Sequence, residues 1–278
     1  MQQDKQNTHQ KNPKVGEIYE LCNTISPFNT QESWDKSGLN LGSFHNEYTD
    51  IVLCLEVNLA IALSLKPNTL LITHHPLFFN PTAQMITDTY PHNIAAILIR
   101  KNCSLISLHT NFDKSHLNTY LTHQILQWHH FVPSEDGLLM SGKIPPISLQ
   151  KLAQDVCKKL NAPSVSFVQG DDITFLNQES QASHTNDAIT EAYVVCGSGC
   201  SLLSQIQPNP HICLLTGDIK HHDAMMAKSM GISLIDIGHY ESEKYFVEIF
   251  DSILQNVGYN AIIMDCKNPF YFCQAKHQ

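Results

Sequence analysis

Hydrophobic positions recur along this chain in two distinct ways. Short aliphatic runs end at polar clusters, whereas longer segments repeat apolar residues at helical spacing. The short runs predict strands at 51–55, 70–73, 105–108, 165–168, 192–195, 212–215 and 232–237. The periodic segments predict helices at 15–25, 58–65, 94–101, 117–128, 148–160, 221–230 and 246–254. This alternation of strands and helices predicts an α/β fold.

Turn-forming residues interrupt the pattern near the middle of the chain. Pro133, Gly137, Gly142, Pro145 and Pro146 mark a change of character there. We therefore predict two interlinked α/β domains, of which the first is discontinuous. Their expected limits are residues 1–130 with about 212–278 for the first domain and about 131–211 for the second. The polar segments 1–14 and 177–190 are predicted to be a disordered arm and a surface loop.

The run at 70–73 ends at two adjacent histidines, His74 and His75, which are followed by Pro76. Pro76 favours extended geometry at His75, so the pair is expected at a strand end, where functional sites of open α/β sheets gather. Because adjacent extended residues point to opposite sides, the two imidazoles are expected to bind two neighbouring ions rather than share one. The alternative is a pair of neutral histidines that cap the strand or hydrogen-bond to carbonyl groups.

Two further predicted strands end in residues of the same kind. His109 and Asp113 follow one of them, and His239 and Glu243 follow another. A helical turn after the strand would place His239 and Glu243 on one face, and the two oxygens of Glu243 would allow it to bridge two ions. Mixed imidazole and carboxylate ligands suit Zn, Mn, Fe or Co better than Ca. The pattern therefore predicts a dinuclear site for divalent metal ions.

Composition narrows the class of protein. The 278 residues carry a formal net charge of −9, and Arg100 is the one arginine, which argues against a surface that tracks nucleic-acid phosphates. The apolar runs are too short to span a bilayer and the first residues form no apolar signal segment, so we expect a cytoplasmic protein without a membrane partner. The nine cysteines are then expected to be reduced thiols.

Five segments of the chain together resemble a known family, the NGG1-interacting-factor-3-like proteins, which are also called GTP cyclohydrolase I type 2 homologues. The matching segments are Glu32-Ser33-Trp34-Asp35 with Gly38-Leu39, Thr73-His74-His75-Pro76-Leu77, His109-Thr110-Asn111-Phe112-Asp113, Thr216-Gly217-Asp218-Ile219-Lys220 with His222-Asp223-Ala224, and Gly238-His239-Tyr240 with Glu243. The resemblance covers nearly the whole chain. This sequence departs from the family at Glu56, where Asp is usual, and at Lys36, where Asn is common.

The resemblance implies a subunit of two α/β domains with mixed sheets, two divalent metal ions in the cleft between the domains, and a homohexameric ring. Carried over residue by residue, it implies that one ion is held by His75, Asp113 and Glu243. The other ion would be held by His74, His239 and Glu243, so that Glu243 bridges the two.

Several other residues have less definite roles. His109 is expected to orient a ligand by hydrogen bonding rather than to bind metal, because the implied ligands already fill the site. His222 is interpreted either as lining the site or as an ordinary helix histidine. Asp35 is interpreted as a cap, Trp34 as a core residue and Asp218 as a turn residue, with contact to a ligand as the alternative for each.

These features favour a metal-dependent hydrolase in which two ions activate water. The resemblance implies that the substrate is GTP or a related nucleotide, with ring opening at the formyl-bearing carbon. That reaction needs a proton donor for the departing nitrogen, and His109 and His222 are the candidates. The alternative function is a non-catalytic metal-binding or adaptor ring, whereas the acidic balance opposes a nucleic-acid clamp.

Overall fold

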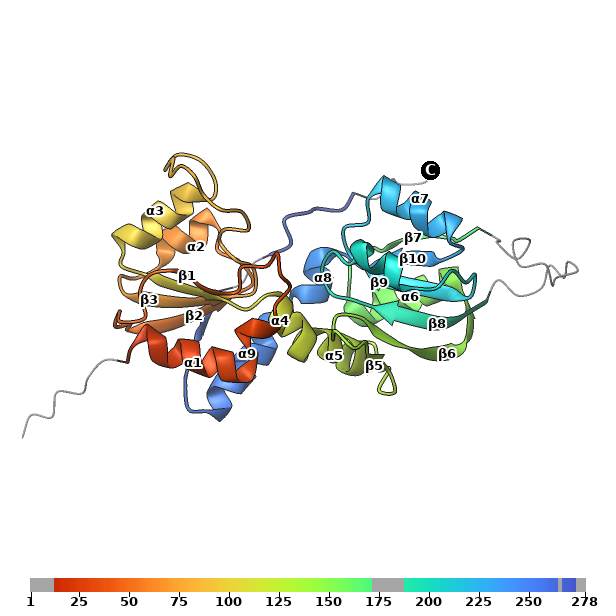
Figure 1. The fold of residues 1–278 in the computed structure, drawn as a ribbon, viewed down its shortest axis with the longest axis horizontal. Coiled ribbons are helices and arrows are strands. Elements are labelled where there is room, and N and C mark those ends of the chain that lie inside the picture. Colours follow the sequence, from red (N-terminus) through yellow and green to blue (C-terminus); the bar gives the residue numbers. More distant parts are fainter. Residues whose placement is uncertain (1–12, 172–187, 265–266, 274–278) are drawn as a thin grey trace, which may run out of the picture. The chain divides into compact units, whose positions relative to one another are not determined.

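The chain forms two compact units, each with its own sheet (Figure 1). The computed structural model describes residues 13–171, 188–264 and 267–273. The first unit comprises Met1–Asn111 and Asp251–Cys266, and the second comprises Phe112–Phe250 and Lys267–Gln278. Both sheets mix parallel and antiparallel strands and are covered by helices, so the predicted α/β class is confirmed. Most of the predicted arm at 1–14 and of the predicted loop at 177–190 lies outside the described residues.

The first unit is built on a five-stranded sheet with the order β1-β4-β3-β2-β11. Strand β1 is antiparallel to β4, and the other neighbours are parallel. Figure 1 shows α2 and α3 over one face of this sheet and α1 over the other. The elements are α1 (Val15–Ile25), η1 (Phe28–Thr30), β1 (Gly38–Leu41), β2 (Asp50–Cys54), α2 (Leu59–Ser64), β3 (Thr69–Thr73), α3 (His92–Arg100), β4 (Ser104–Ser107) and β11 (Ile262–Ile263).

The centre of this sheet explains the aliphatic runs of the sequence. Every residue of β3 is buried, as expected of a parallel strand covered on both faces. Strands β2 and β3 pair in parallel from Asp50 opposite Thr69 to Cys54 opposite Thr73, and α2 connects them, so the predicted strands and helix form a β-α-β unit. The side chain of Asn58 begins α2 by accepting a hydrogen bond from the backbone N–H of Ile61 at 2.9 Å.

The second unit is built on a six-stranded sheet with the order β5-β6-β8-β9-β10-β7. Strands β8, β9 and β10 are parallel, and the remaining pairs are antiparallel. The chain enters this unit within α4, leaves it within α9 and returns to it at Lys267. The elements are α4 (Thr110–Phe112), η2 (Asp113–Leu117), α5 (Asn118–Tyr120), η3 (Leu121–Ile125), β5 (Val132–Pro133), β6 (Met140–Ser148), α6 (Leu149–Leu160), β7 (Ser166–Val168), β8 (Ala188–Val194), η5 (Cys200–Gln205), β9 (Ile212–Thr216), α7 (His221–Ser229), β10 (Ser233–Asp236), α8 (His239–Glu243) and α9 (Phe246–Asn256).

The turns expected around Gly142 and the two prolines that follow are wrong, because Met140–Ser148 forms the strand β6. The register of β6 with β8 shifts between Lys143 and Ile147. Such an irregularity accommodates Pro145 and Pro146, which cannot donate hydrogen bonds to a ladder.

Strand pairing also bears on where the chain divides. The strands β9 and β10 extend the sheet that contains β8, so residues 212–236 lie in the second unit. The sequence pattern led us to group about 212–278 with residues 1–130 instead. Periodicity does not report which distant strands pair, because that depends on long-range contacts.

The described residues contain no helix that is long and apolar enough to cross a membrane. The cysteines in the same part of the chain are free thiols, and most of them are buried.

Candidate metal centre

In the first unit, the carboxyl ends of two parallel strands bring three histidines together. Strand β3 ends at Thr73, directly before His74 and His75, and its neighbour β4 ends at Ser107, two residues before His109. The ring centroids lie 5.1 Å apart for His74 and His75, 5.1 Å for His74 and His109, and 5.6 Å for His75 and His109. One nitrogen of each ring lies within 4.8 Å of the others, so the three side chains could hold a metal ion.

The histidine pair lies in a bend of the backbone. The N–H groups of His74 and His75 both donate to the carbonyl oxygen of Leu55, at 3.1 and 3.0 Å. The hydroxyl of Thr73 donates to the carbonyl of His75 at 2.8 Å. The expectation that the two imidazoles point to opposite sides is therefore wrong, because alternation holds only for regular extended strands and this segment turns.

All three imidazoles are held through the same ring atom, Nδ1. The Nδ1 distances are 2.9 Å for His74 to the carbonyl oxygen of Leu108, 3.4 Å for His75 to Glu56 Oε2, and 2.9 Å for His109 to Asp35 Oδ1. An Nδ1–H that donates to oxygen leaves the lone pair of the neutral ring on Nε2, which is how metal-binding histidines are usually oriented. The arrangement therefore offers Nε2 of each ring as the ligand atom.

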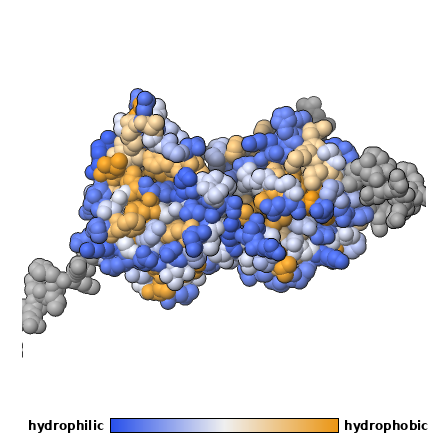
Figure 2. Space-filling model, in the orientation of Figure 1, coloured by the Kyte–Doolittle hydropathy of each residue, from blue (hydrophilic) through white to orange (hydrophobic). Residues whose placement is uncertain are grey.

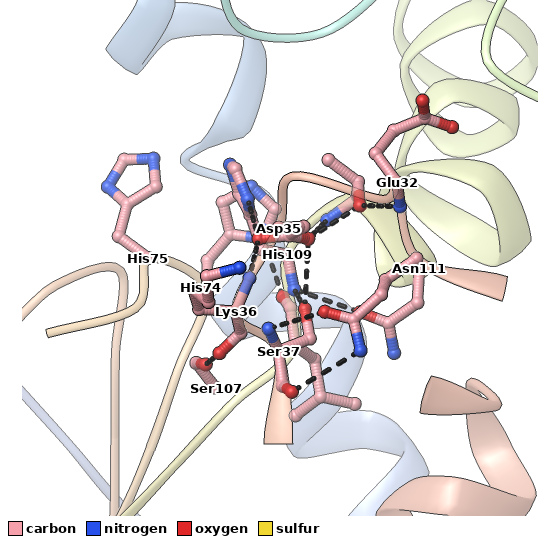
Figure 3. Close-up of polar contacts among 12 residues, drawn as sticks. Glu32, Asp35, Lys36, Ser37, His74, His75, Ser107, His109 and Asn111 are labelled. Atoms are coloured by element: carbon pink, nitrogen blue, oxygen red, sulfur yellow. Dashed lines mark hydrogen bonds and ion pairs between the residues drawn. The ribbon is translucent and has the colours of Figure 1, made fainter. Parts of the chain in front are cut away.

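Asp35 is the polar centre of this part of the first unit (Figure 3). Its buried Oδ1 accepts from the His109 ring and from the backbone of Lys36, at 2.9 and 2.7 Å. Its Oδ2 accepts from the backbone N–H and hydroxyl of Thr110, at 3.0 and 2.5 Å, and from the hydroxyl of Ser37 at 3.1 Å. Burial acts to raise the pKa of Asp35, but the hydrogen bonds from His109, Thr110 and the Lys36 amide outweigh it and hold that pKa well below its usual range. Asp35 is therefore an ionised anchor.

In the second unit, helix α8 presents a histidine and a carboxylate on one face. His239 Nε2 lies 2.9 Å from Glu243 Oε2, which confirms the placement predicted from their spacing. His239 Nδ1 lies 2.7 Å from Asp218 Oδ2. Asp218 follows β9, and His239 follows the adjacent parallel strand β10. The second unit thus also places its polar residues at the carboxyl ends of parallel strands.

Glu243 is buried beside a glycine turn. Its side chain is 2% exposed. A Cβ atom at Gly197, whose φ is +63°, would lie only 2.3 Å from Glu243 Oε1. The N–H of Gly197 donates to the hydroxyl of Ser242, next to Glu243, at 3.0 Å. The absence of a side chain at Gly197 therefore leaves room for the carboxylate of Glu243.

Asp113 is the second buried carboxylate of this unit. It begins η2, a π-helical segment, which is a rare geometry that occurs often at functional sites. Burial raises the pKa of the Cys196 thiol well above its ordinary value, and the nearby carboxylates of Asp113 and Glu243 raise it further. Cys196 is therefore held as a neutral thiol, which is the opposite of the thiolate that binds metal.

The remaining predicted residues lie as follows. His221 and His222 begin α7, where both are exposed and their ring centroids lie 5.8 Å apart. The core position expected of Trp34 is wrong, because its side chain is 57% exposed and the neighbouring Asp35 anchors the loop instead.

Sequence reasoning missed two contributors to these clusters, Glu56 and Gly197. Glu56 follows β2, the parallel neighbour of β3, so the rule that found the histidines at strand ends also indicates this carboxylate. The role of Gly197 had no signal in the sequence, because it depends on contact with a residue more than forty positions later.

The fold and these side chains define an α/β protein whose histidine and acidic groups could hold a metal ion. The model of the family described as Duf34/NIF3 (NGG1p interacting factor 3) matches residues 13–269. The chain belongs to this family, and the resemblance seen in the sequence is confirmed.

Relatives and solved structures agree with this assignment. A Helicobacter pylori protein named GTP cyclohydrolase 1 type 2 is 42% identical over 255 residues, which cover 92% of this chain and 97% of that protein. A Campylobacter jejuni GTP cyclohydrolase 1 type 2 homolog is 38% identical and covers 93% of this chain and 99% of its own. A crystal structure of a Staphylococcus aureus hypothetical protein covers 95% of this chain and all of its own, with a TM-score of 0.74 and 24% identity, and supports the fold.

Proposed function

We propose that this chain is a cytoplasmic, dinuclear metal-dependent hydrolase that acts on GTP or a related nucleotide. One observation carries the proposal: four histidines at strand ends each have Nδ1 hydrogen-bonded to an oxygen. The four rings and their acceptors are His74 with Leu108, His75 with Glu56, His109 with Asp35, and His239 with Asp218. This orientation is the usual outer support of metal-binding imidazoles and supports His74, His75 and His239 as ligands, whereas at His109 it turns Nε2 toward a substrate.

The proposed ligands are two imidazoles of the first unit, His74 and His75, and three side chains of the second, Asp113, His239 and Glu243. Buried carboxylates and neutral imidazoles are the donors that Zn, Mn, Fe and Co accept. Two divalent ions, when bound, supply Lewis-acid chemistry that activates water and stabilises negative charge. The identity of the metal is left to elemental analysis.

The role proposed for His109 is to face the substrate. Asp35 holds its Nδ1 at 2.9 Å, so the lone pair of Nε2 can accept a hydrogen bond or a proton from the substrate or water and, once protonated, pass that proton to the departing nitrogen. His222, exposed at the start of α7, is the second candidate for that task. The names of the Helicobacter pylori and Campylobacter jejuni relatives support GTP as the first substrate to test.

The experiment is an assay of GTP turnover across a panel of divalent metals. We expect a loss of the guanine absorbance that depends on added metal and is at least tenfold slower in a His109→Gln variant. Turnover that is equal with and without chelator would contradict the proposal. A fully metallated protein that turns over no nucleotide would favour the non-catalytic metal-binding alternative.

The family resemblance also supports a homohexameric assembly, which we include in the proposal. Light scattering on the purified chain gives its mass directly. A monomer at micromolar concentration would contradict the homohexameric assembly but would not affect the proposed chemistry of the histidines.

A further inference from the structure

Two aromatic side chains of the first unit stay partly exposed while contacting the same histidine. Trp34 is 57% exposed and Phe79 is 44% exposed. Their ring centroids lie 5.9 and 5.5 Å from that of His109, with interplanar angles of 74° and 78°. Both contacts are close to perpendicular, so neither ring stacks face to face on the imidazole.

Both aromatic residues stand on anchored backbone. Trp34 precedes Asp35, whose carboxylate is buried and accepts hydrogen bonds from four neighbouring residues. Phe79 lies two residues after Leu77, which is buried and donates its N–H to Asn40 Oδ1 at 2.8 Å. Their exposure is therefore a feature of fixed loops. Aromatic side chains fixed in this way offer a ligand a large contact area at little cost in conformational entropy.

The first unit exposes other hydrophobic side chains, and Phe79 lies close to the histidine pair. Figure 2 shows hydrophobic atoms exposed among polar ones over the unit that contains α2 and α3. Phe79 also lies near the histidine pair, with its ring centroid 6.4 Å from that of His75. A ligand that covered Trp34 and Phe79 would thus be placed beside His75 and His109.

Charge selects the part of a ligand that these rings would contact. Asp35 and Glu56 put negative charge next to the same histidines, and the chain as a whole carries −9 with a single arginine, Arg100. These carboxylates disfavour a phosphate directly against the two rings and leave phosphate binding to the proposed metal ions. A planar heteroaromatic ring, in contrast, gains stacking energy from aromatic side chains without needing a positive charge.

We propose that Trp34 and Phe79 bind the nucleobase of the substrate by stacking and so place its ring beside His109. The proposal rests on the proposed function, and it names the substrate class that this side of the site would take. It makes the two residues determinants of specificity, because a substrate without a planar ring would lose both contacts.

The test uses the fluorescence of the full-length protein. The chain has two tryptophans, Trp34 and Trp128. Trp128 belongs to the second unit, where it stacks on Phe131, so a Trp128→Phe variant leaves Trp34 as the one reporter. The probes are guanosine, GTP and inorganic tripolyphosphate, each titrated at fixed metal content.

We expect guanosine and GTP to quench Trp34 fluorescence and tripolyphosphate to leave it unchanged. Phe79→Ala should weaken guanosine binding roughly 5- to 100-fold, the range expected for one lost base-stacking contact. Phe79→Tyr, which keeps the ring, should restore the affinity. Metal content and near-ultraviolet circular dichroism check that each variant is folded and loaded.

Three results would overturn the inference: equal quenching by tripolyphosphate and GTP, unchanged guanosine affinity in Phe79→Ala, or no quenching by any nucleoside. The outcome is separable from that of the proposed function. Guanosine binding without turnover supports the stacking site and rejects the hydrolase, whereas turnover with an unchanged KM in Phe79→Ala supports the hydrolase and rejects the stacking site.

Discussion

The sheets of the two units place polar side chains at equivalent edges, but these side chains differ in chemistry. In both, polar side chains follow the carboxyl ends of parallel strands. The first unit offers three imidazoles, each oriented by a hydrogen bond at Nδ1. The second unit offers the buried carboxylates of Asp113 and Glu243 with one imidazole, that of His239. Each imidazole is therefore oriented by the oxygen next to its Nδ1, and the carboxylate of Glu243 lies in the space left by the absence of a side chain at Gly197.

The largest effect is expected where an acceptor is also a structural anchor. Asp35→Ala removes the acceptor of the His109 ring and leaves the buried donors of Thr110 without their partner. We expect the free energy of unfolding to fall by about 3 kcal/mol, measured by urea denaturation. The control is Asp155→Ala, which breaks an exposed pair with Lys151 and should cost less than about 0.5 kcal/mol. Equal losses of unfolding free energy in the two variants would show that Asp35 does not anchor the loop.

The next effect tests whether space positions the carboxylate. Gly197→Ala adds a Cβ 2.3 Å from Glu243 Oε1 at a positive φ, so we expect a loss of about 2 kcal/mol in unfolding free energy together with loss of bound metal. Gly258→Ala is the matched control, because it also has a positive φ but no atom within 4 Å of the added Cβ. That variant should lose about 1 kcal/mol and keep its metal. Metal retained by Gly197→Ala would show that Glu243 needs no such space.

A smaller effect is expected from the acceptor of the second unit. Asp218→Asn keeps the shape of the side chain but removes the charge 2.7 Å from His239 Nδ1. We expect metal affinity to fall roughly 10- to 100-fold, as is usual when the carboxylate behind a ligating histidine is lost. Competition with a chromophoric chelator measures the affinity. An unchanged value would mean that His239 is oriented by its backbone alone.

The smallest effect is expected at Glu56. Its carboxylate lies 3.4 Å from His75 Nδ1 and its side chain is 45% exposed, so solvent weakens the interaction. Glu56→Gln should therefore lower metal affinity by less than about 10-fold. The same chelator titration applies. A larger loss than in Asp218→Asn would reverse the proposed order of the two acceptors.

Much of the fold follows from the sequence because it depends on local pattern. The buried strand β3 is visible in the sequence as a run of aliphatic residues. The start of α2 is visible as Asn58, which caps that helix. The helical placement of His239 and Glu243 also follows from spacing alone. These features need no knowledge of distant residues.

The features that could not be predicted from the sequence depend on contacts between distant residues. Strand β6 contains Pro145 and Pro146, which read as turns, yet a register shift against β8 accommodates them. The exposure of Trp34 follows from the buried contacts of Asp35 with residues more than seventy positions away. The close fit of Gly197 against Glu243 likewise has no local signal.

The most direct test of the account is the metal content of the purified chain and of one variant, measured by elemental analysis after dialysis. We predict about two divalent ions per chain in the unaltered protein and almost none in Glu243→Ala, because Glu243 is proposed to bridge both. Glu241→Ala, in the same helix, is the control and should keep both ions, since Glu241 pairs with Lys244 and Asn268 instead. Full metal content in Glu243→Ala would contradict the central claim.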